Sequence, residues 1–262
     1  MNRFVIVLVA FLAFVSAYAL FVEPNALEIN HYKIQDKQLS GIKIAFISDL
    51  NLGKTDFKKL DNVIKKINKE KPDITLIGGD FVNGSSPSRT MNLDIMAQKL
   101  SLLHSKVFTV LGSEDYTNDY TKIISALRKN DIYVLQNDRK KIIVKRRYVD
   151  IVGIDDFTSK RANIQRAFYR SITPRIVLTH NPDIYYQIME ESNIILAGHN
   201  HGGQIILPLM PPLFMNSKFG SKFASGLIKE TQNQMIITKG IGTRIVPMRL
   251  NCKPEIVIID FI

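Results

Sequence analysis

The stretch IKIAFISDLN, residues 42–51, indicates the fold of this chain because a mainly apolar run ends abruptly in two polar side chains, Asp49 and Asn51. Two later stretches have the same form, ITLIGGD at residues 74–80 and IILAGHNH at residues 194–201. Short apolar runs of this kind are typical of strands that are buried on both faces. A strand that stops at a polar residue places it at the carboxyl edge of the sheet, where open α/β sheets build their sites. The three stretches therefore predict a single site in which their polar ends meet.

The polar residues at these three ends are a mixture of Asp and His, namely Asp49, Asp80, His199 and His201. Carboxylate and imidazole together suit Zn, Mn or Fe, and a carboxylate placed between two ions makes a two-metal site. Such a pair activates water and holds both oxygens of an in-line phosphoryl displacement. The expected chemistry is therefore hydrolysis of a phosphoester or pyrophosphate bond.

The rest of the chain alternates apolar, strand-like runs with amphipathic segments. Phe57–Glu70 is expected to be a helix because its apolar residues fall on one stripe and its lysines lie opposite. Further helices are expected at residues 91–104, 120–130 and 183–191, and further strands at 107–111, 132–135, 142–145, 149–154, 175–179, 234–238 and 255–261. This alternation predicts an α/β fold with helices packed on sheet faces. Residues 23–41 are expected to be a connector with one or two short edge strands, and residues 42–262 a single catalytic domain.

The N-terminus contains nineteen residues without a charge, from Phe4 to Val22. At about 1.5 Å per residue, a helix of this length matches the hydrocarbon thickness of a bilayer, and we expect residues 1–22 to form a transmembrane anchor with the membrane face undetermined. A signal peptide is the alternative, because Ala17-Tyr18-Ala19 fits a small-x-small cleavage pattern. A buried core helix fits poorly, since the run has no polar face.

The chain carries a formal net charge of +11, from 35 Lys and Arg against 24 Asp and Glu. This excess is typical either of a basic protein surface or of attraction to an anionic partner, such as a lipid surface or a nucleotide-linked substrate. Basic residues flank residues 142–144, but no aromatic platform accompanies them, so nucleic-acid binding is the weakest alternative. Cys252 is the single cysteine and is expected to be buried. No feature of the sequence indicates a protein partner.

Several phrases occur together in a characteristic order. In addition to the three stretches above they are Gly112-Ser113-Glu114-Asp115, Val152-Gly153-Ile154-Asp155-Asp156, His180-Asn181-Pro182-Asp183, Gly202-Gly203-Gln204, Gly240-Ile241-Gly242-Thr243 and Pro247-Met248-Arg249. From residue 42 to the C-terminus the chain resembles the calcineurin-like metallophosphoesterase superfamily. It is similar to the membrane-associated branch that includes bacterial phosphodiesterases and the UDP-diacylglucosamine pyrophosphatases of lipid A synthesis.

The resemblance implies a four-layer α-β-β-α sandwich of two mixed sheets and a site for two divalent metal ions. Asp49 and His201 would hold the first ion, Asp80 would bridge both, and His180 and His199 would hold the second. A water made acidic by the two cations would attack phosphorus.

Two motifs depart from the family pattern. Where the family has Asp-x-His, this chain has Asn51, and where it has Gly-Asn-His, this chain has Ser113 and Glu114. Asn51 and Ser113 are therefore expected to be auxiliary metal ligands, Ser113 through water. These oxygen donors favour Mn²⁺, with Zn²⁺ or Fe²⁺ also compatible. Glu114 or Asp115 would assist catalysis.

Substrate contacts and membrane contacts are expected from two further parts of the sequence. Arg244 and Arg249 are candidates for binding substrate phosphate, although single basic residues are commonly only solvated. Residues 207–223 are rich in Leu, Met, Phe and Pro, which is typical either of a loop that dips into a membrane or of a loop folded onto the core.

Two functions remain open from the sequence. The first is a membrane-anchored, metal-dependent hydrolase of a phosphodiester or pyrophosphate bond in a lipid- or nucleotide-linked substrate. The second is a catalytically weakened or inactive binding or regulatory protein with the same fold, which the replacements at Asn51, Ser113 and Glu114 suggest.

Overall fold

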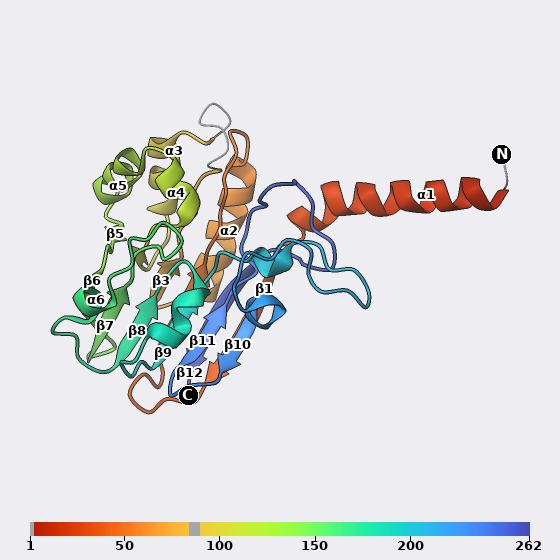
Figure 1. Ribbon diagram of the computed structural model, residues 1–262. Helices are drawn as coiled ribbons and strands as arrows, with labels where there is room; N and C mark the ends of the chain where they lie inside the picture. The colour runs from red at the N-terminus through yellow and green to blue at the C-terminus, as the bar shows by residue number, and fades with distance from the viewer. Residues whose placement is uncertain (1–2, 84–89) are drawn as a thin grey trace.

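The computed structural model describes residues 3–83 and 90–262, and its body is built from two six-stranded sheets (Figure 1). The first sheet has the order β1 (Glu28–Ile34), β12 (Glu255–Phe261), β2 (Lys43–Ile47), β3 (Ile74–Ile77), β4 (Lys106–Thr109) and β5 (Tyr133–Val134). The second has the order β10 (Gly226–Lys229), β11 (Gln234–Ile237), β9 (Ile194–Ala197), β8 (Arg175–Leu178), β7 (Arg147–Gly153) and β6 (Asp138–Val144). Both sheets are mixed, because β12 runs antiparallel to β2 and both β10–β11 and β6–β7 are antiparallel pairs.

The two sheets pack against each other, and strand β2 shows how. Its residues Ile44 and Phe46 belong to the apolar core between the sheets, whereas Ala45 and Ile47 face the helices on the outer side. Because side chains alternate along a strand, a strand buried on both faces must be apolar throughout. The predicted sandwich of two mixed sheets between helical layers is confirmed.

The outer face of the first sheet is covered by three helices, α2 (Phe57–Glu70), α3 (Leu93–Leu100) and α5 (Tyr120–Lys129). The outer face of the second sheet is covered by α6 (Ile164–Phe168) and by the short helical turns η4 (Pro182–Gln187) and η6 (Gly220–Phe223). Helix α4 (Ser113–Thr117) and the turn η5 (His201–Gly203) lie at strand ends. The helix predicted at residues 183–191 was too long.

The connector predicted at residues 23–41 contains one strand, β1, which pairs in parallel with β12 along its full length. It is longer than the short edge strand expected from the sequence. Strand β10 was not predicted; its four residues, Gly226–Lys229, carry two apolar side chains between a glycine and a lysine, which is too weak a pattern to indicate a strand.

Helix α1 (Arg3–Ala17) projects away from the body and continues into the turns η1 (Tyr18–Val22) and η2 (Glu23–Asn25) (Figure 1). The helical segment Arg3–Asn25 has the length and the apolar composition needed to cross a membrane. Almost none of its most apolar stretch is buried. In this structure the segment is not enclosed by a core, which favours the span over the alternative of a buried core helix. A signal sequence would pass the same test.

The end of this segment is fixed to the body at residues 249–252. Ala19 is buried, and its carbonyl accepts a hydrogen bond from the amide of Arg249 at 2.9 Å. The buried carboxylate of Glu23 accepts a hydrogen bond from the amide of Cys252, which is itself buried as predicted. The direction in which α1 leaves the body is thus set by hydrogen bonds to the chain near its C-terminus.

The Arg249 side chain is fully buried, and the prediction that it binds substrate phosphate is wrong. Its guanidinium donates to the carbonyl oxygens of Gly242 at 2.6 Å, Lys239 at 2.8 Å and Cys252 at 2.9 Å. A guanidinium has five N–H donors, and in Arg249 backbone carbonyls accept the hydrogen bonds that it offers. Arg249 therefore holds the loop of residues 239–252, on which both Arg244 and the contact with Ala19 depend.

Replacing Arg249 with Met should destabilise the fold on the order of 3 kcal/mol, because several buried carbonyls would lose their donors. The matched control is Arg128→Met, which removes an exposed arginine from α5 and should change stability by less than about 0.5 kcal/mol. Thermal or chemical unfolding of both variants measures the difference. Equal stability of the two variants would contradict this role for Arg249.

Candidate metal centre

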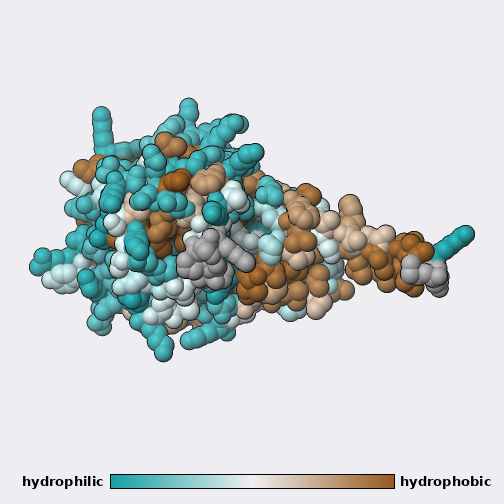
Figure 2. Space-filling model, turned by 90° about the horizontal axis from the view of Figure 1, so that it is seen from above, coloured by the Kyte–Doolittle hydropathy of each residue, from teal (hydrophilic) through white to brown (hydrophobic). Residues whose placement is uncertain are grey.

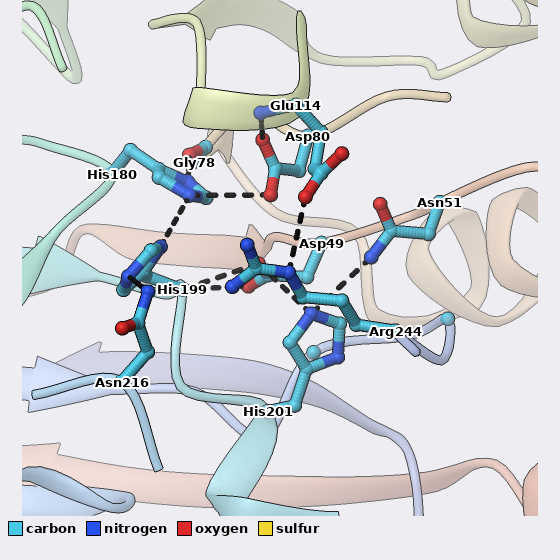
Figure 3. Close-up of polar contacts among 12 residues, drawn as sticks. Asp49, Asn51, Gly78, Asp80, Glu114, His180, His199, His201, Asn216 and Arg244 are labelled. Carbon is cyan, nitrogen blue, oxygen red and sulfur yellow. Dashed lines mark hydrogen bonds and ion pairs between the residues drawn. The ribbon is translucent and has the colours of Figure 1, made fainter. Parts of the chain in front are cut away.

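Three acidic and imidazole side chains converge where β2, β3 and β8 end. The ligand atoms of Asp49, Asp80 and His180 all lie within 4.8 Å of one another, and all three residues are buried (Figure 3). Asp49 follows β2, Asp80 follows β3 and His180 follows β8, so strands from both sheets contribute. The structure thus brings together residues that are distant in sequence at one edge of the sandwich.

The backbone at this edge adopts a conformation that non-glycine residues rarely take. The φ angle is positive at Asp49 (53°), Asn51 (42°), Asp80 (54°), His199 (74°) and His201 (50°). A left-handed conformation costs a non-glycine residue of order 1–3 kcal/mol, and such strain concentrates at functional sites. The left-handed conformation occurs at five positions of this edge, which indicates that the fold maintains the placement of these side chains despite the conformational free energy that it costs.

Two glycines allow the acidic side chains to approach the backbone. A Cβ atom at Gly112 would lie 2.2 Å from Oδ1 of Asp80, and a Cβ atom at Gly198 would lie 2.4 Å from Oδ2 of Asp49. Both separations are far inside van der Waals contact, so any larger residue would displace the carboxylate. These glycines are required by the site rather than by the turns that contain them.

One half of the site consists of Asp80, His180 and His199. Nε2 of His180 lies 3.3 Å from Oδ2 of Asp80 and 3.1 Å from Nδ1 of His199. The other ring nitrogen of His180, Nδ1, lies 2.8 Å from the carbonyl oxygen of Gly78. A carbonyl can only accept, so His180 donates its Nδ1 proton and directs Nε2 toward Asp80. Metal-binding histidines are characteristically oriented in this way.

The other half consists of Asp49, His201 and Asn51. Nε2 of His201 lies 3.4 Å from Oδ1 of Asp49 and 3.2 Å from Nδ2 of Asn51. The Asp49 carboxylate also accepts the backbone amide of His199, at 2.9 Å to Oδ2, which ties the two halves together. The residues are thus grouped as the family resemblance implied, and their roles as ligands are proposed below.

Burial and charge set the protonation of these groups. Burial lowers the pKa of His201 to about 4, and burial together with the nearby His180 lowers that of His199 to about 4. For His180, burial also acts to lower the pKa, but the Asp80 carboxylate raises it well above the usual value. For Asp80, burial acts to raise the pKa, but His180 outweighs it and lowers the pKa to about 2. Two neutral imidazoles and an ionised carboxylate are the forms that bind metal.

Three buried polar atoms of the site have no hydrogen-bond partner within the part of the chain that the structure describes. They are Oδ1 of Asn51, Oγ of Ser113 and Nδ1 of His201. A buried polar atom without a partner costs about 1–3 kcal/mol. The oxygens of Asn51 and Ser113, with the two buried carboxylates and Nε2 of His201, form a donor set that fits a divalent cation, so the residues present are compatible with the metals that the fold family uses.

A search against protein-family models matches residues 42–203 to the calcineurin-like phosphoesterases. The chain belongs to this family.

Relatives support the assignment over nearly the whole length. The chain is 29% identical to an uncharacterized metallophosphoesterase of Aquifex aeolicus over 91% of this chain and 93% of the relative. It is 27% identical to the phosphodiesterase YaeI of Escherichia coli over 94% of this chain and 92% of the relative. Among solved structures, TT1561 of Thermus thermophilus matches with a TM-score of 0.51 at 11% identity, over 77% of this chain and 91% of that one. This last likeness shows the fold alone.

One of the departures from the calcineurin-like pattern contacts a residue of the candidate site. Glu114, which stands where the family has His, forms an ion pair with Arg244, with 3.0 Å between Oε1 and Nε. Arg244 lies across the cluster in Figure 3, and it lines a cavity of about 270 Å³ with His199 and His201. Of the two arginines predicted to bind phosphate, Arg244 is therefore the one placed at the site.

Asp115, which was expected to assist catalysis, is fully buried, and its carboxylate is occupied by backbone amides. Its carboxylate accepts the backbone amides of Asp80 at 2.8 Å, Phe81 at 2.9 Å and Gly112 at 2.9 Å. Burial, and then the charge of Asp80, raise its pKa to about 7. Asp115 positions the loop that presents Asp80.

Sequence reasoning missed Asn216, whose side-chain amide lies 3.1 Å from Nε2 of His199. It fixes the orientation of that ring, so that Nδ1 of His199 is directed toward His180. A single Asn within the apolar residues 207–223 carries no signal that could have indicated this contact.

Asp80→Asn is expected to prevent the binding of a metal pair, since this carboxylate lies within 4.8 Å of the candidate ligand atoms of both Asp49 and His180. The substitution preserves the shape of the side chain and an acceptor for the amide of Glu114. Elemental analysis and calorimetric titration with Mn²⁺ should show two ions in the natural protein and at most one in the variant. Asp94→Asn, at an exposed position on α3, is the control and should bind as the natural protein does. Equal metal content in Asp80→Asn would contradict the shared position.

Proposed function

We propose that this protein is a metal-dependent hydrolase of a phosphodiester or pyrophosphate bond, anchored to a membrane by its N-terminal helix. The observation that carries the proposal is the convergence of Asp49, Asp80 and His180, buried within 4.8 Å of one another, with His199 and His201 in contact with them. Membership of the calcineurin-like family, and the name of the relative YaeI as a phosphodiesterase, support this class of reaction.

In this proposal Asp49, His201 and Asn51 would hold one divalent cation, His180 and His199 would hold the other, and Asp80 would contribute to both. When bound, such a pair polarises a phosphoryl oxygen and makes a water molecule acidic. Ser113 is an auxiliary oxygen donor. The oxygen-rich donor set favours Mn²⁺ over Zn²⁺ or Fe²⁺.

The remaining residues of the site bind and orient the substrate. Arg244 presents its guanidinium in the cavity beside His199 and His201, where it donates to a phosphate oxygen. Glu114 holds Arg244 in place and partly neutralises it. A carboxylate in this position repels a dianionic phosphomonoester more strongly than a phosphoryl group with a single charge, which supports a diester, or a pyrophosphate with one charge on each phosphoryl group, as the substrate.

Two cavities that meet at Met215 and Asn216 provide space for the rest of the substrate. One is the 270 Å³ cavity that contains Arg244, and the other, of about 640 Å³, is lined by Phe157, Lys218 and Asn181 among others. Volumes in this range are typical of sites for small organic ligands. A lipid- or nucleotide-linked substrate, such as a precursor of lipid A, fits this description.

The alternative is a protein of the same family that has lost catalysis and serves in binding or regulation. Two observations favour it. The amide of Asn51 lies against Nε2 of His201, a nitrogen needed for a metal, and the pair of Glu114 and Arg244 covers the cluster.

The two alternatives are separated by hydrolysis assays on the full chain in detergent. The natural protein, freed of metal and then supplied with Mn²⁺, should hydrolyse bis(p-nitrophenyl) phosphate, or a member of a panel of lipid- and nucleotide-linked diesters and pyrophosphates, and Asp80→Asn should not. Combined replacement of Asn51→His, Ser113→Asn and Glu114→His should lower this activity if the altered site is a working variant. No metal content and no turnover in the natural protein, with a large gain in the triple variant, would establish the inactive alternative.

Arg244→Gln should raise KM for an anionic diester about 10- to 100-fold, because a charge-assisted hydrogen bond to phosphate is lost and Glu114 is left without its cation. Steady-state kinetics on the soluble diester measures this change. The control is Arg166→Gln, which removes an exposed arginine from α6 and should leave KM as it is. An unaltered KM in Arg244→Gln would exclude Arg244 from substrate binding.

A further inference from the structure

Four large apolar side chains are exposed on two neighbouring loops beside the metal centre. The exposed fractions are 108% for Leu209, 75% for Ile245, 52% for Met210 and 48% for Leu213. We call these four residues the apolar lip. Exposed apolar residues that are gathered together, rather than scattered singly, commonly mark a surface that contacts a membrane or another molecule.

The two loops that carry the apolar lip are joined rigidly. The Gln204 side-chain amide donates to the carbonyls of Val246 at 2.9 Å and Met248 at 3.0 Å, and its oxygen accepts the amide of Arg244 at 2.6 Å. The amide of Ile206 donates to the carbonyl of Leu250 at 2.9 Å. Three prolines, at positions 208, 211 and 212, stiffen the first loop further.

These loops lie on the side of the body from which α1 departs. Figure 1 shows both loops extending toward the root of α1, and Figure 2 shows hydrophobic surface on α1 and on the part of the body next to it. The second loop is bonded directly to this root, through the amide of Arg249 and the carbonyl of Ala19. A membrane that contains α1 must therefore pass close to the apolar lip.

Two residues of the apolar lip also line the smaller cavity at the site, whereas Leu209 and Met210 lie outside its lining. Leu213 and Ile245 line the 270 Å³ cavity together with His199, His201 and Arg244. The cavity thus has an apolar side that is continuous with the lip and a cationic, imidazole-bearing side at the metal centre. An amphiphile with a phosphate headgroup matches these two sides, because it has an apolar part and an anionic part.

We propose that the apolar lip inserts into the bilayer that holds α1, and that the cavity takes the phosphate headgroup of an amphiphile directly from that bilayer. The uptake of a phosphate headgroup rests on the proposed function. The insertion of the lip into the bilayer rests only on the structure of the lip. The bilayer is favoured over a protein partner as the occupant because the loop that carries Ile245 is hydrogen-bonded to the root of a helix long enough to cross a membrane.

Membrane insertion can be tested by fluorescence because the natural chain contains no Trp. Leu209→Trp in the full chain, reconstituted in phosphatidylcholine nanodiscs, should emit at a shorter wavelength than a solvated Trp. Brominated acyl chains should quench it about two-fold, since inserted apolar groups reach about 5–10 Å into the bilayer. The matched control is Ile143→Trp, at a position that is 63% exposed on β6 at the far edge of the second sheet. Emission and quenching of Leu209→Trp equal to those of the control would overturn the insertion.

The source of the substrate is tested by a ratio of activities. Two hydrolysis rates are measured, one on phosphatidylglycerol in vesicles and one on soluble bis(p-nitrophenyl) phosphate. The ratio of the first rate to the second is compared between the natural protein and the double variant Leu209→Ser and Met210→Ser. The ratio should fall about ten-fold in the double variant, because the headgroup is no longer presented at the cavity, and should be unchanged in Ile143→Ser. An unchanged ratio in the double variant, or turnover of soluble nucleotide diesters alone, would overturn the bilayer as source. A natural protein inactive on every substrate would refute the proposed function, while the fluorescence result would still decide membrane insertion.

Discussion

The Asp80 carboxylate is the group on which the site depends. Gly112 gives it room, Asp115 binds the amide of the same residue, and His180 lies 3.3 Å from one of its oxygens. Gly112 and Asp115 follow β4 of the first sheet and His180 follows β8 of the second, so both sheets must pack correctly before the carboxylate is in place. A buried charge without these partners would cost several kcal/mol, which couples the formation of the site to the packing of the whole sandwich.

The same loop system links the site to the N-terminal helix. Arg249 binds the carbonyls of residues 239–252 from inside, and this loop carries Arg244 toward the metal centre and Ile245 toward the exterior. The backbone amide of Arg249 donates to the carbonyl of Ala19, which lies in the turn η1 that follows α1. Hydrogen bonds therefore join the candidate metal centre, the apolar lip and the root of the apolar helix, which is the arrangement that the proposed membrane-anchored hydrolase requires.

Much of the fold could be predicted from the sequence, because a strand buried on both faces is mainly apolar. Strand β9 is wholly apolar, and β2 and β3 each contain a single polar residue, Lys43 and Thr75. Helix α2 was predicted with the bounds that the structure shows, since one apolar stripe faces the sheet. Strand β10 and helix α6 are short and partly exposed, so their sequences lack the periodicity on which prediction relies. Their positions are set by the neighbours against which they pack.

The sequence by itself determined that polar residues end the buried strands and that Asp and His are the residues found there, because local hydrophobic pattern and residue type require no tertiary knowledge. Only the tertiary structure decided the direction of individual side chains. Arg244 and Arg249 are five positions apart in one loop, yet one faces the metal centre and the other is enclosed by carbonyl groups. The difference arises from contacts between segments that are distant along the chain, and no local pattern encodes such contacts.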